Sequence, residues 1–292
     1  MDTSDILKRV RQVEIKTRGL SRNIFAGEYH SAFKGRGMTF SEVREYRYGD
    51  DTRTIDWNVT ARYNHPYVKV FEEERELTVV LMIDASASRD FGTAAKLKKN
   101  QITEIAAVIA FSAIQNNDKI GVIFFSDKIE KFIPPKKGRT HILHIIRELI
   151  GFRPESKRTD IAGALQYLTG AIKKRCTCFV LSDFIDEHSF ERPLAIANKK
   201  HDVVALRVHD RRESELPPVG WLHLTDAESG ESAWVDTSSK QWQASFRERA
   251  RNRERELERV FKQAGVDVAA IRPDEDYVRA LVALFQRRGT GY

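Results

Sequence analysis

The sequence has few of the residues and segments that define several common protein classes. Its two cysteines, Cys176 and Cys178, lie too close along one strand to form a disulfide, and their spacing lacks the two-residue gap of zinc and redox pairs. No apolar run is long enough to cross a bilayer, and the first residues lack the apolar core of a signal peptide. We therefore expect buried free thiols, no membrane span and a cytoplasmic location.

Motifs of several enzyme classes are also missing. The sequence has no G-x-x-x-x-G-K-[ST] loop, which excludes a P-loop ATPase. No Asp-x-Asp follows the first apolar strand, which disfavours an aspartyl-phosphate phosphatase. The formal charge of +7 arises from residues of both signs dispersed along the chain, so a solvated basic surface is favoured over a nucleic-acid-binding patch.

Apolar strands alternate with amphipathic helices through most of the chain. This alternation predicts an α/β fold with a doubly wound, mostly parallel sheet of Rossmann type. We expect strands at Leu77–Asp84, Ile120–Phe125, Cys176–Leu181, Val203–Val208 and Val266–Ile271, with an edge strand at Ile129–Ile133 that Pro134 and Pro135 stop. We expect helices at Lys96–Gln115, His141–Ile150, Ile161–Ile172, Phe190–Lys199, Gln241–Gln263 and Asp276–Gln286, and a hairpin insertion at residues 221–236 that turns at Glu228–Ser229–Gly230.

The N-terminal part has a different composition, so we divide the chain into residues 1–76 and 77–292. Met1–Arg22 has a thin helical apolar stripe, and residues 27–76 are rich in Gly, Arg, Tyr and Asp, with a strand expected at Tyr67–Phe71. An Arg–Asp network around a buried Trp57 and a partner-docking face both explain this stretch. The pattern does not decide between these two interpretations.

Three oxygen-bearing residues follow the first core strand. The apolar run from Leu77 ends in Asp84, Ser86 and Ser88, and this alternation points their side chains the same way. Oxygen ligands suit a hard cation such as Mg²⁺, although Mn²⁺ or Ca²⁺ would also fit. The same residues taken alone would also form an ordinary turn after a strand.

Two further residues belong to the same edge of the predicted sheet. Thr159 precedes a helix, and Asp183 follows the strand that begins at Cys176. Right-handed crossovers bring the carboxyl ends of parallel strands to one edge, where ligands of such sheets bind. We therefore predict that Asp84, Thr159 and Asp183 lie together.

This combination resembles the metal-ion-dependent adhesion site of von Willebrand factor A domains, over roughly Leu77–Val208. The stretch REYRYGDDTRTIDWNVTAR, the later DAESGE and the Arg-rich helix after it resemble the domain-of-unknown-function 58 family, whose members are relatives of that domain. The resemblance implies a metal held by Asp84, Ser86, Ser88, Thr159 and Asp183, with an open position for a partner's carboxylate. It also implies a protein partner, since members of the family commonly accompany MoxR-type AAA+ ATPases.

Two alternatives use the same edge. A Mg²⁺-dependent nuclease would gather Asp84, Asp90, Asp160 and Asp183, but the motif places Ser and Thr where such an enzyme needs carboxylates. A scaffold that has lost its ion is the other alternative, and the complete ligand set argues against it. We therefore expect a binding module and not an enzyme.

Overall fold

The computed structural model describes residues 39–72, 77–90 and 98–289. The chain forms two compact units, of which the smaller is Lys34–Leu77. The larger unit contains the described residues from Thr78 onward, and the helix predicted at Met1–Arg22 lies outside the described residues.

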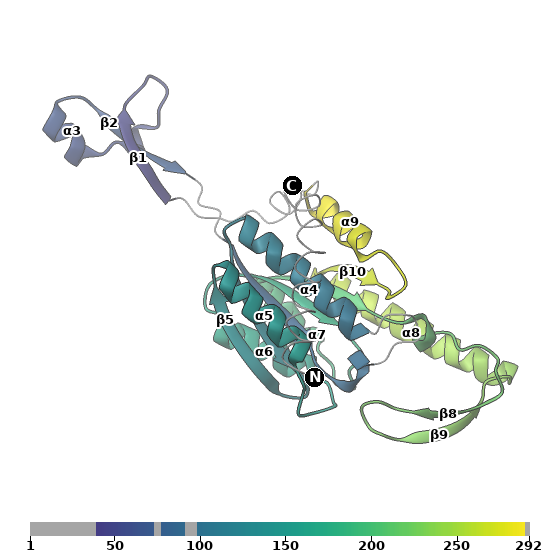
Figure 1. Cartoon of the computed structure of the whole chain (residues 1–292). Coiled ribbons are helices and arrows are strands. Elements are labelled where there is room, and N and C mark those ends of the chain that lie inside the picture. Colours follow the sequence, from purple (N-terminus) through teal and green to yellow (C-terminus); the bar gives the residue numbers. More distant parts are fainter. Residues whose placement is uncertain (1–38, 73–76, 91–97, 290–292) are drawn as a thin grey trace. The chain divides into compact units, whose positions relative to one another are not determined.

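The smaller unit is a two-stranded sheet with two short helical segments (Figure 1). Strand β1 (Thr39–Glu45) pairs antiparallel with β2 (Tyr67–Glu72), which confirms the predicted strand, and η1 (Thr52–Thr54) and α3 (Trp57–Tyr63) lie between them in the chain. Ion pairs join Arg44 to Asp50 and Arg53 to Asp51, at 2.7 and 2.9 Å. The predicted Arg–Asp network is therefore present.

One of the two interpretations of this stretch required a buried Trp57, and the structure contradicts that part of it, because the Trp57 side chain is 70% exposed. Asp56, and not the Trp57 indole, stabilises the N-terminus of α3. Its carboxylate accepts hydrogen bonds from the backbone N–H groups of Asn58 and Val59, and it also pairs with Lys69. The indole is left on the solvent side of the first helical turn.

The larger unit is built on a six-stranded sheet in the order β10-β7-β6-β3-β4-β5. Every neighbouring pair is parallel except β4 and β5, which confirms the predicted mostly parallel α/β fold. The strands are β3 (Thr78–Asp84), β4 (Lys119–Phe125), β5 (Ile129–Lys136), β6 (Thr177–Ser182), β7 (Asp202–Val208) and β10 (Asp267–Ile271). The central strands β3 and β6 are buried along almost their whole length, as expected for continuous apolar runs.

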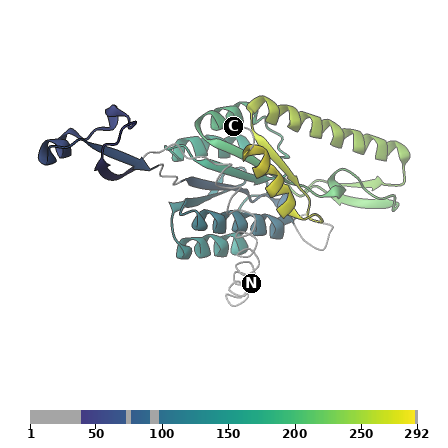
Figure 2. The ribbon, with the colours of Figure 1, turned by 90° about the horizontal axis from the view of Figure 1, so that it is seen from above.

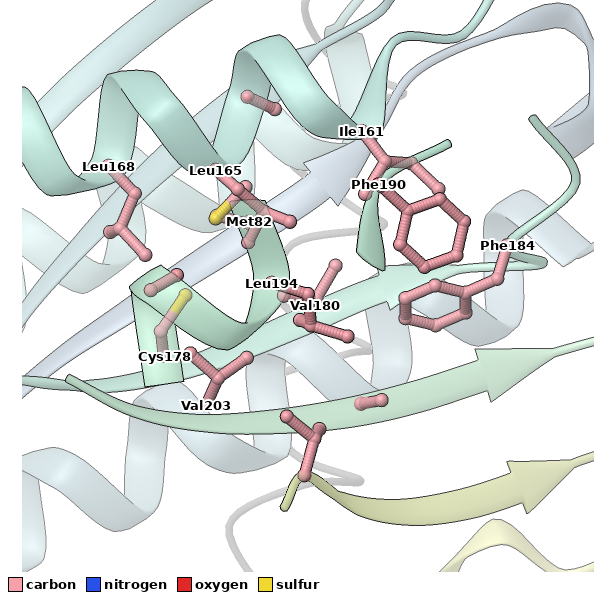
Figure 3. Close-up of a cluster of buried hydrophobic side chains, with 14 of the residues drawn as sticks. Met82, Ile161, Leu165, Leu168, Cys178, Val180, Phe184, Phe190, Leu194 and Val203 are labelled. Carbon is pink, nitrogen blue, oxygen red and sulfur yellow. The ribbon is translucent and has the colours of Figure 1, made fainter. Parts of the chain in front are cut away.

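Helices cover both faces of this sheet (Figure 2). Their bounds are α4 (Lys98–Gln115), α5 (Arg139–Gly151), α6 (Ile161–Ala171), α7 (Glu191–Lys200), α8 (Lys240–Ala264) and α9 (Tyr277–Gly289). Side chains from α6, α7 and the second half of α8 pack with one face of the sheet in a single apolar cluster (Figure 3). On the opposite face the Phe285 ring of α9 packs edge-on against Phe179 of β6. Both cysteines are buried free thiols, as predicted.

The prediction that Pro134 and Pro135 stop the edge strand is wrong. Strand β5 continues through both prolines to Lys136. An edge strand tolerates proline where its missing N–H would have faced away from the sheet. The neighbouring strand adapts through Gly121, where an added Cβ would lie 2.8 Å from both the Ile133 carbonyl oxygen and the Pro135 nitrogen.

The predicted hairpin consists of β8 (Trp221–Thr225) and β9 (Ser232–Asp236), a separate two-stranded sheet. Helix α8 follows it, capped by the Ser239 hydroxyl and ended by Gly265 in the left-handed conformation. The apolar face predicted for α8 is buried in its second half, at Leu257 and Phe261. No helix among the described residues is long and apolar enough to cross a membrane.

Candidate metal site

The candidate site lies where β3 and β6 end side by side. Their parallel register pairs Ile83 with Leu181, so Asp84 and Ser182 occupy the next level of the two strands. The Ser182 hydroxyl donates to Asp84 Oδ2 at 2.6 Å, and Asp183 follows directly. Asp84 and Asp183 are both buried, at 2% and 4% exposure. The parallel sheet thus brings the two predicted carboxylates to one edge.

The segment after β3 places two hydroxyls beside Asp84. The Ser86 backbone N–H donates to Asp84 Oδ1 at 2.9 Å, and the Ser86 and Ser88 hydroxyl oxygens lie 2.9 Å apart. Backbone hydrogen bonds from Ala85 to Phe125 and from Ala87 to Lys157 fix this segment against β4 and the segment before α6. The segment therefore holds the Ser86 and Ser88 hydroxyls within hydrogen-bond distance of each other.

Thr159 reaches the site from the segment before α6. The Asp160 N–H donates to the Ser126 carbonyl beyond β4, and Asp160 Oδ1 accepts from Gly163 N–H as the helix cap. Thr159, 5% exposed, donates its hydroxyl to Glu228 Oε1 at 2.8 Å. Glu228 belongs to the β8–β9 turn, so the hairpin contributes to this edge, which the sequence prediction did not include.

A buried lysine pairs with Asp183. Lys98 Nζ of α4 lies 3.1 Å from Asp183 Oδ2 and also pairs with Glu213, and the lysine side chain is 2% exposed. The sequence prediction missed Lys98, although a signal exists. Lys98 stands at helical spacing from Ile102 and Ile105, on the buried face of α4, where a charge requires a partner.

Negative charge accumulates at this edge. Burial raises the pKa of Asp84 to about 6, and the charge of Asp183 adds to the rise. Burial also raises the pKa of Glu228 to about 7; the Thr159 hydrogen bond lowers it, and the charges of Asp84 and Asp183 add to the rise. Burial lowers the pKa of Lys98, but the charges of Asp183 and Glu213 more than offset that effect, and the pKa is raised.

Acidic groups outnumber basic groups at this edge. Asp84, Asp183, Glu213 and Glu228 carry four negative charges when ionised, and Lys98 carries one positive charge. No group of three His, Cys, Asp or Glu side chains within residues 39–72, 77–90 and 98–289 is placed to hold a metal ion. A metal here would therefore depend on hydroxyl oxygens as well as carboxylates, a donor set that suits Mg²⁺ or Ca²⁺.

The residues of the nuclease alternative are not all available at this edge. Asp160 is engaged in capping α6, and the side chain of Asp90 lies outside what the structure describes. The capping role of Asp160 thus disfavours the set of carboxylates that the nuclease alternative requires.

Among solved structures, an aerotolerance-related membrane protein from Bacteroides fragilis aligns with a TM-score of 0.50 at 13% identity. The alignment covers 74% of this chain and 100% of that chain. The von Willebrand factor A domain of SpRpn10 aligns with a TM-score of 0.42 at 11% identity, over 74% of this chain and 98% of that chain. At such identity the first similarity concerns the fold alone. The sheet order, with β5 as its antiparallel edge, agrees with the von Willebrand factor A-like fold predicted from the sequence.

Sequence comparison covers nearly the whole chain. The chain is 30% identical over 295 residues to the protein Rv1480 of Mycobacterium tuberculosis and to Mb1516 of Mycobacterium bovis, covering 100% of this chain and 92% of each relative. YeaD of Bacillus subtilis is 27% identical over 109 residues, 37% of this chain and 25% of that protein. Residues 42–256 match the family described as "Protein of unknown function DUF58". The chain therefore belongs to the DUF58 family, as its sequence motifs predicted.

Proposed function

We propose that the larger unit is a protein-binding module that depends on a divalent metal ion. Mg²⁺ is the proposed ion, with Mn²⁺ or Ca²⁺ as substitutes, and Asp84, Ser86, Ser88, Thr159 and Asp183 are the residues that would hold it. The observation that carries the proposal is the pair of buried aspartates, Asp84 and Asp183, at the carboxyl edge of the sheet, with the Ser86 and Ser88 hydroxyl oxygens 2.9 Å apart in the segment that follows Asp84. The von Willebrand factor A-like fold supports an interaction module over an enzyme.

Each residue has a distinct part in this proposal. Asp84 and Asp183 supply the negative charge, while Ser86, Ser88 and Thr159 offer neutral oxygens. Ser182 and the Ser86 N–H hold Asp84 in one orientation, and Lys98 holds Asp183. Two carboxylates leave a bound divalent ion electrophilic, so that it would accept a carboxylate from a partner. Recognition of this kind requires no chemical change in the partner.

The proposed partner is a protein that presents an Asp or Glu side chain, and the adaptor role that family resemblance implies makes a MoxR-type AAA+ ATPase the first candidate. A site with three carboxylate ligands would not serve this purpose. The ion would then be neutralised and would attract a partner's carboxylate only weakly. The proposal therefore depends on the hydroxyls as much as on the aspartates.

A pull-down with purified MoxR-type ATPase from the same source tests this proposal. The wild-type chain should retain the ATPase in Mg²⁺ and lose it in EDTA, and Asp84→Ala should not retain it in either buffer. Asp274→Ala, at an exposed position, serves as the matched control and should behave as wild type. Equal recovery in EDTA and Mg²⁺ would contradict the metal dependence.

A further inference from the structure

The β8–β9 hairpin presents two tryptophans on one of its faces. Its register pairs Trp221 with Asp236 and His223 with Trp234. Since side chains alternate between the two faces of a strand, these four lie on the same face. The Trp221 side chain is 68% exposed and that of Trp234 is 67% exposed, with the His223 ring 5.0 Å from the Trp234 ring.

The opposite face of the hairpin is the more covered one. It carries Leu222, Leu224 and Val235, which are half-buried. The hairpin therefore leaves its two largest apolar side chains in water while its smaller ones are partly covered. Tryptophan is enriched among the residues that dominate protein interfaces, because its ring buries a large area and its N–H can still form a hydrogen bond. The tryptophan face, defined by Trp221, His223 and Trp234, thus has the composition of a binding surface.

The charge of the hairpin limits what this face would bind. Residues 221–236 include four acidic residues, Asp226, Glu228, Glu231 and Asp236, and no Lys or Arg. Asp236 lies on the tryptophan face, and Asp226 and Glu231 are exposed at the turn. The face of an indole ring also attracts cations, arginine most often. Both features favour a partner surface that presents arginine.

Helix α8, which follows the hairpin, carries such a surface. Residues 247–255 contain five Arg and two Glu, and one of these acids, Glu254, pairs with Arg207 outside the helix. Four of the arginines are exposed and form no ion pair with another residue in the described part of the chain: Arg249, Arg251, Arg253 and Arg255. The N-terminal half of α8 is therefore basic and without acidic partners for these four side chains.

Arg251 and Arg255 form one stripe of this basic surface. They are four residues apart, which places them on the same side of the helix, where like charges repel each other weakly. An acidic surface bound along the helix would remove this repulsion. The arginine stripe, defined by Arg251 and Arg255, is therefore complementary in charge and chemistry to the tryptophan face.

The two surfaces do not meet within one chain. The hairpin and the N-terminal half of α8 extend from the same end of the larger unit (Figure 2), and burial in α8 is confined to Leu257, Val260 and Phe261. Both indoles are exposed, so nothing in the described chain covers them. Two copies related by a two-fold axis would join the complementary surfaces twice, because each copy offers both.

We propose that the chain forms a symmetric dimer in which Trp221 and Trp234 of one copy pack on Arg251 and Arg255 of the other. The guanidinium groups stack on the indole rings, and the acidic residues of the hairpin compensate their charge. None of the five proposed metal ligands belongs to either surface, so the dimer is independent of the metal-dependent binding proposed above.

Sedimentation velocity of the full-length chain over a range of concentrations tests the dimer. The wild type should dimerise as its concentration rises, and about 0.5 M NaCl should weaken the dimer by screening its charges. Trp221→Ser with Trp234→Ser, and separately Arg251→Glu with Arg255→Glu, should each raise the dissociation constant at least about 100-fold. Circular dichroism verifies that both variants, altered only at exposed positions, remain folded.

The matched control is Arg249→Glu with Arg253→Glu. These exposed arginines lie two residues, or about 200° of helical turn, from the arginine stripe. The control makes the same change of charge on the same helix and should raise the dissociation constant less than about fivefold. A loss as large as that of the Arg251 and Arg255 variant would overturn the assignment of the stripe.

A mixture of the two interface variants gives a readout that misfolding would not reproduce. The tryptophan variant keeps its arginine stripe and the arginine variant keeps its tryptophan face, so a mixed pair retains one of the two contacts. The mixture should form a heterodimer at concentrations where neither variant alone dimerises. A mixture that stays monomeric would contradict the pairing of the two surfaces. A wild type that is monomeric at every concentration would overturn the proposal and leave a foreign basic protein as the occupant of the tryptophan face.

Discussion

Lys98 carries a buried positive charge that pairs with two carboxylates at the edge of the sheet. Its ammonium lies between the carboxylates of Asp183 and Glu213, and both it and Asp183 are almost inaccessible to water. A buried ion pair of this kind is costly to break, because removing one partner leaves the other charge uncompensated. Lys98 is therefore a positioning residue for Asp183, and its effect on stability should depend on the metal.

Replacing Lys98 with Met should lower the free energy of unfolding by about 3 kcal/mol in EDTA, since Asp183 and Glu213 would lose their cation. Mg²⁺ should recover part of this loss by compensating Asp183. Denaturant titrations with and without Mg²⁺ measure both effects. Lys174→Met, at an exposed position, should change the stability by less than about 0.5 kcal/mol. An equal loss in the two buffers would argue that Lys98 has no relation to a metal.

His201 predicts a pH dependence away from the site. Burial lowers its pKa to about 4, with smaller contributions from Lys200 and Arg175, and its Nδ1 lies 3.3 Å from the Cys176 sulfur. The folded state therefore favours neutral imidazole, whereas the unfolded chain binds a proton near pH 6.5. This contribution to stability is complete above pH 6.5 and is lost as the pH falls toward 4.

Between pH 6.5 and 4, the wild type should lose about 2 kcal/mol of unfolding free energy through His201. His201→Leu, which cannot take up the proton, should lose less over the same range. Denaturant titrations at several pH values compare the two. Parallel pH profiles for both proteins would show that His201 is already protonated, or exposed, in the folded state.

At this scale the sequence reveals residues whose type is unusual for their position. Asp84, Ser86 and Ser88 follow directly on an apolar run, and this abrupt change of residue type is visible without a structure. Glu228 is not visible in this way, because acidic residues are ordinary in hairpin turns and nothing local indicates that the turn meets Thr159. Long-range contacts between loops leave no periodic signal in either partner.

At the scale of the elements, β4 and β5 pack closely because Gly121 of β4 has only a hydrogen atom as its side chain. Gly121→Ala should lower the unfolding free energy by about 2 kcal/mol, because the new methyl group would meet the backbone of Ile133 and Pro135. Gly170→Ala has open space around its Cβ in α6 and should instead stabilise the protein by about 0.5 kcal/mol. Thermal unfolding of both variants gives the two signs. A loss of stability in both would point to a general effect of replacing glycine.

Most elements follow from hydrophobic periodicity, because strands buried on both faces and helices packed on them leave strong patterns. The exceptions have local causes. Proline ends a strand by removing a donor, but Pro134 and Pro135 lie in an edge strand, and the sequence does not show which strand is at the edge. Trp57 is exposed. A large apolar ring is buried only where a core lies next to it, and the sequence does not show whether one does.

At the scale of the whole molecule, the sheet topology brings together residues that are far apart in the sequence. Strands β3 and β6 are distant in sequence but adjacent in the sheet, which brings Asp84 beside Ser182 and Asp183. The right-handed crossover rule makes this juxtaposition predictable from the strand pattern. The rule does not reach the β8–β9 hairpin, which belongs to a separate sheet, and the position of Glu228 required the structure.

The most direct test of the metal site is calorimetric titration of Mg²⁺ into the full-length chain and its Asp84→Asn variant. The wild type should bind about one ion, and Asp84→Asn should bind none while remaining folded, because the substitution also relieves repulsion from Asp183. Circular dichroism verifies the fold, and Asp274→Asn is the control that should bind as wild type does. Equal Mg²⁺ binding by Asp84→Asn and the wild type would contradict the account.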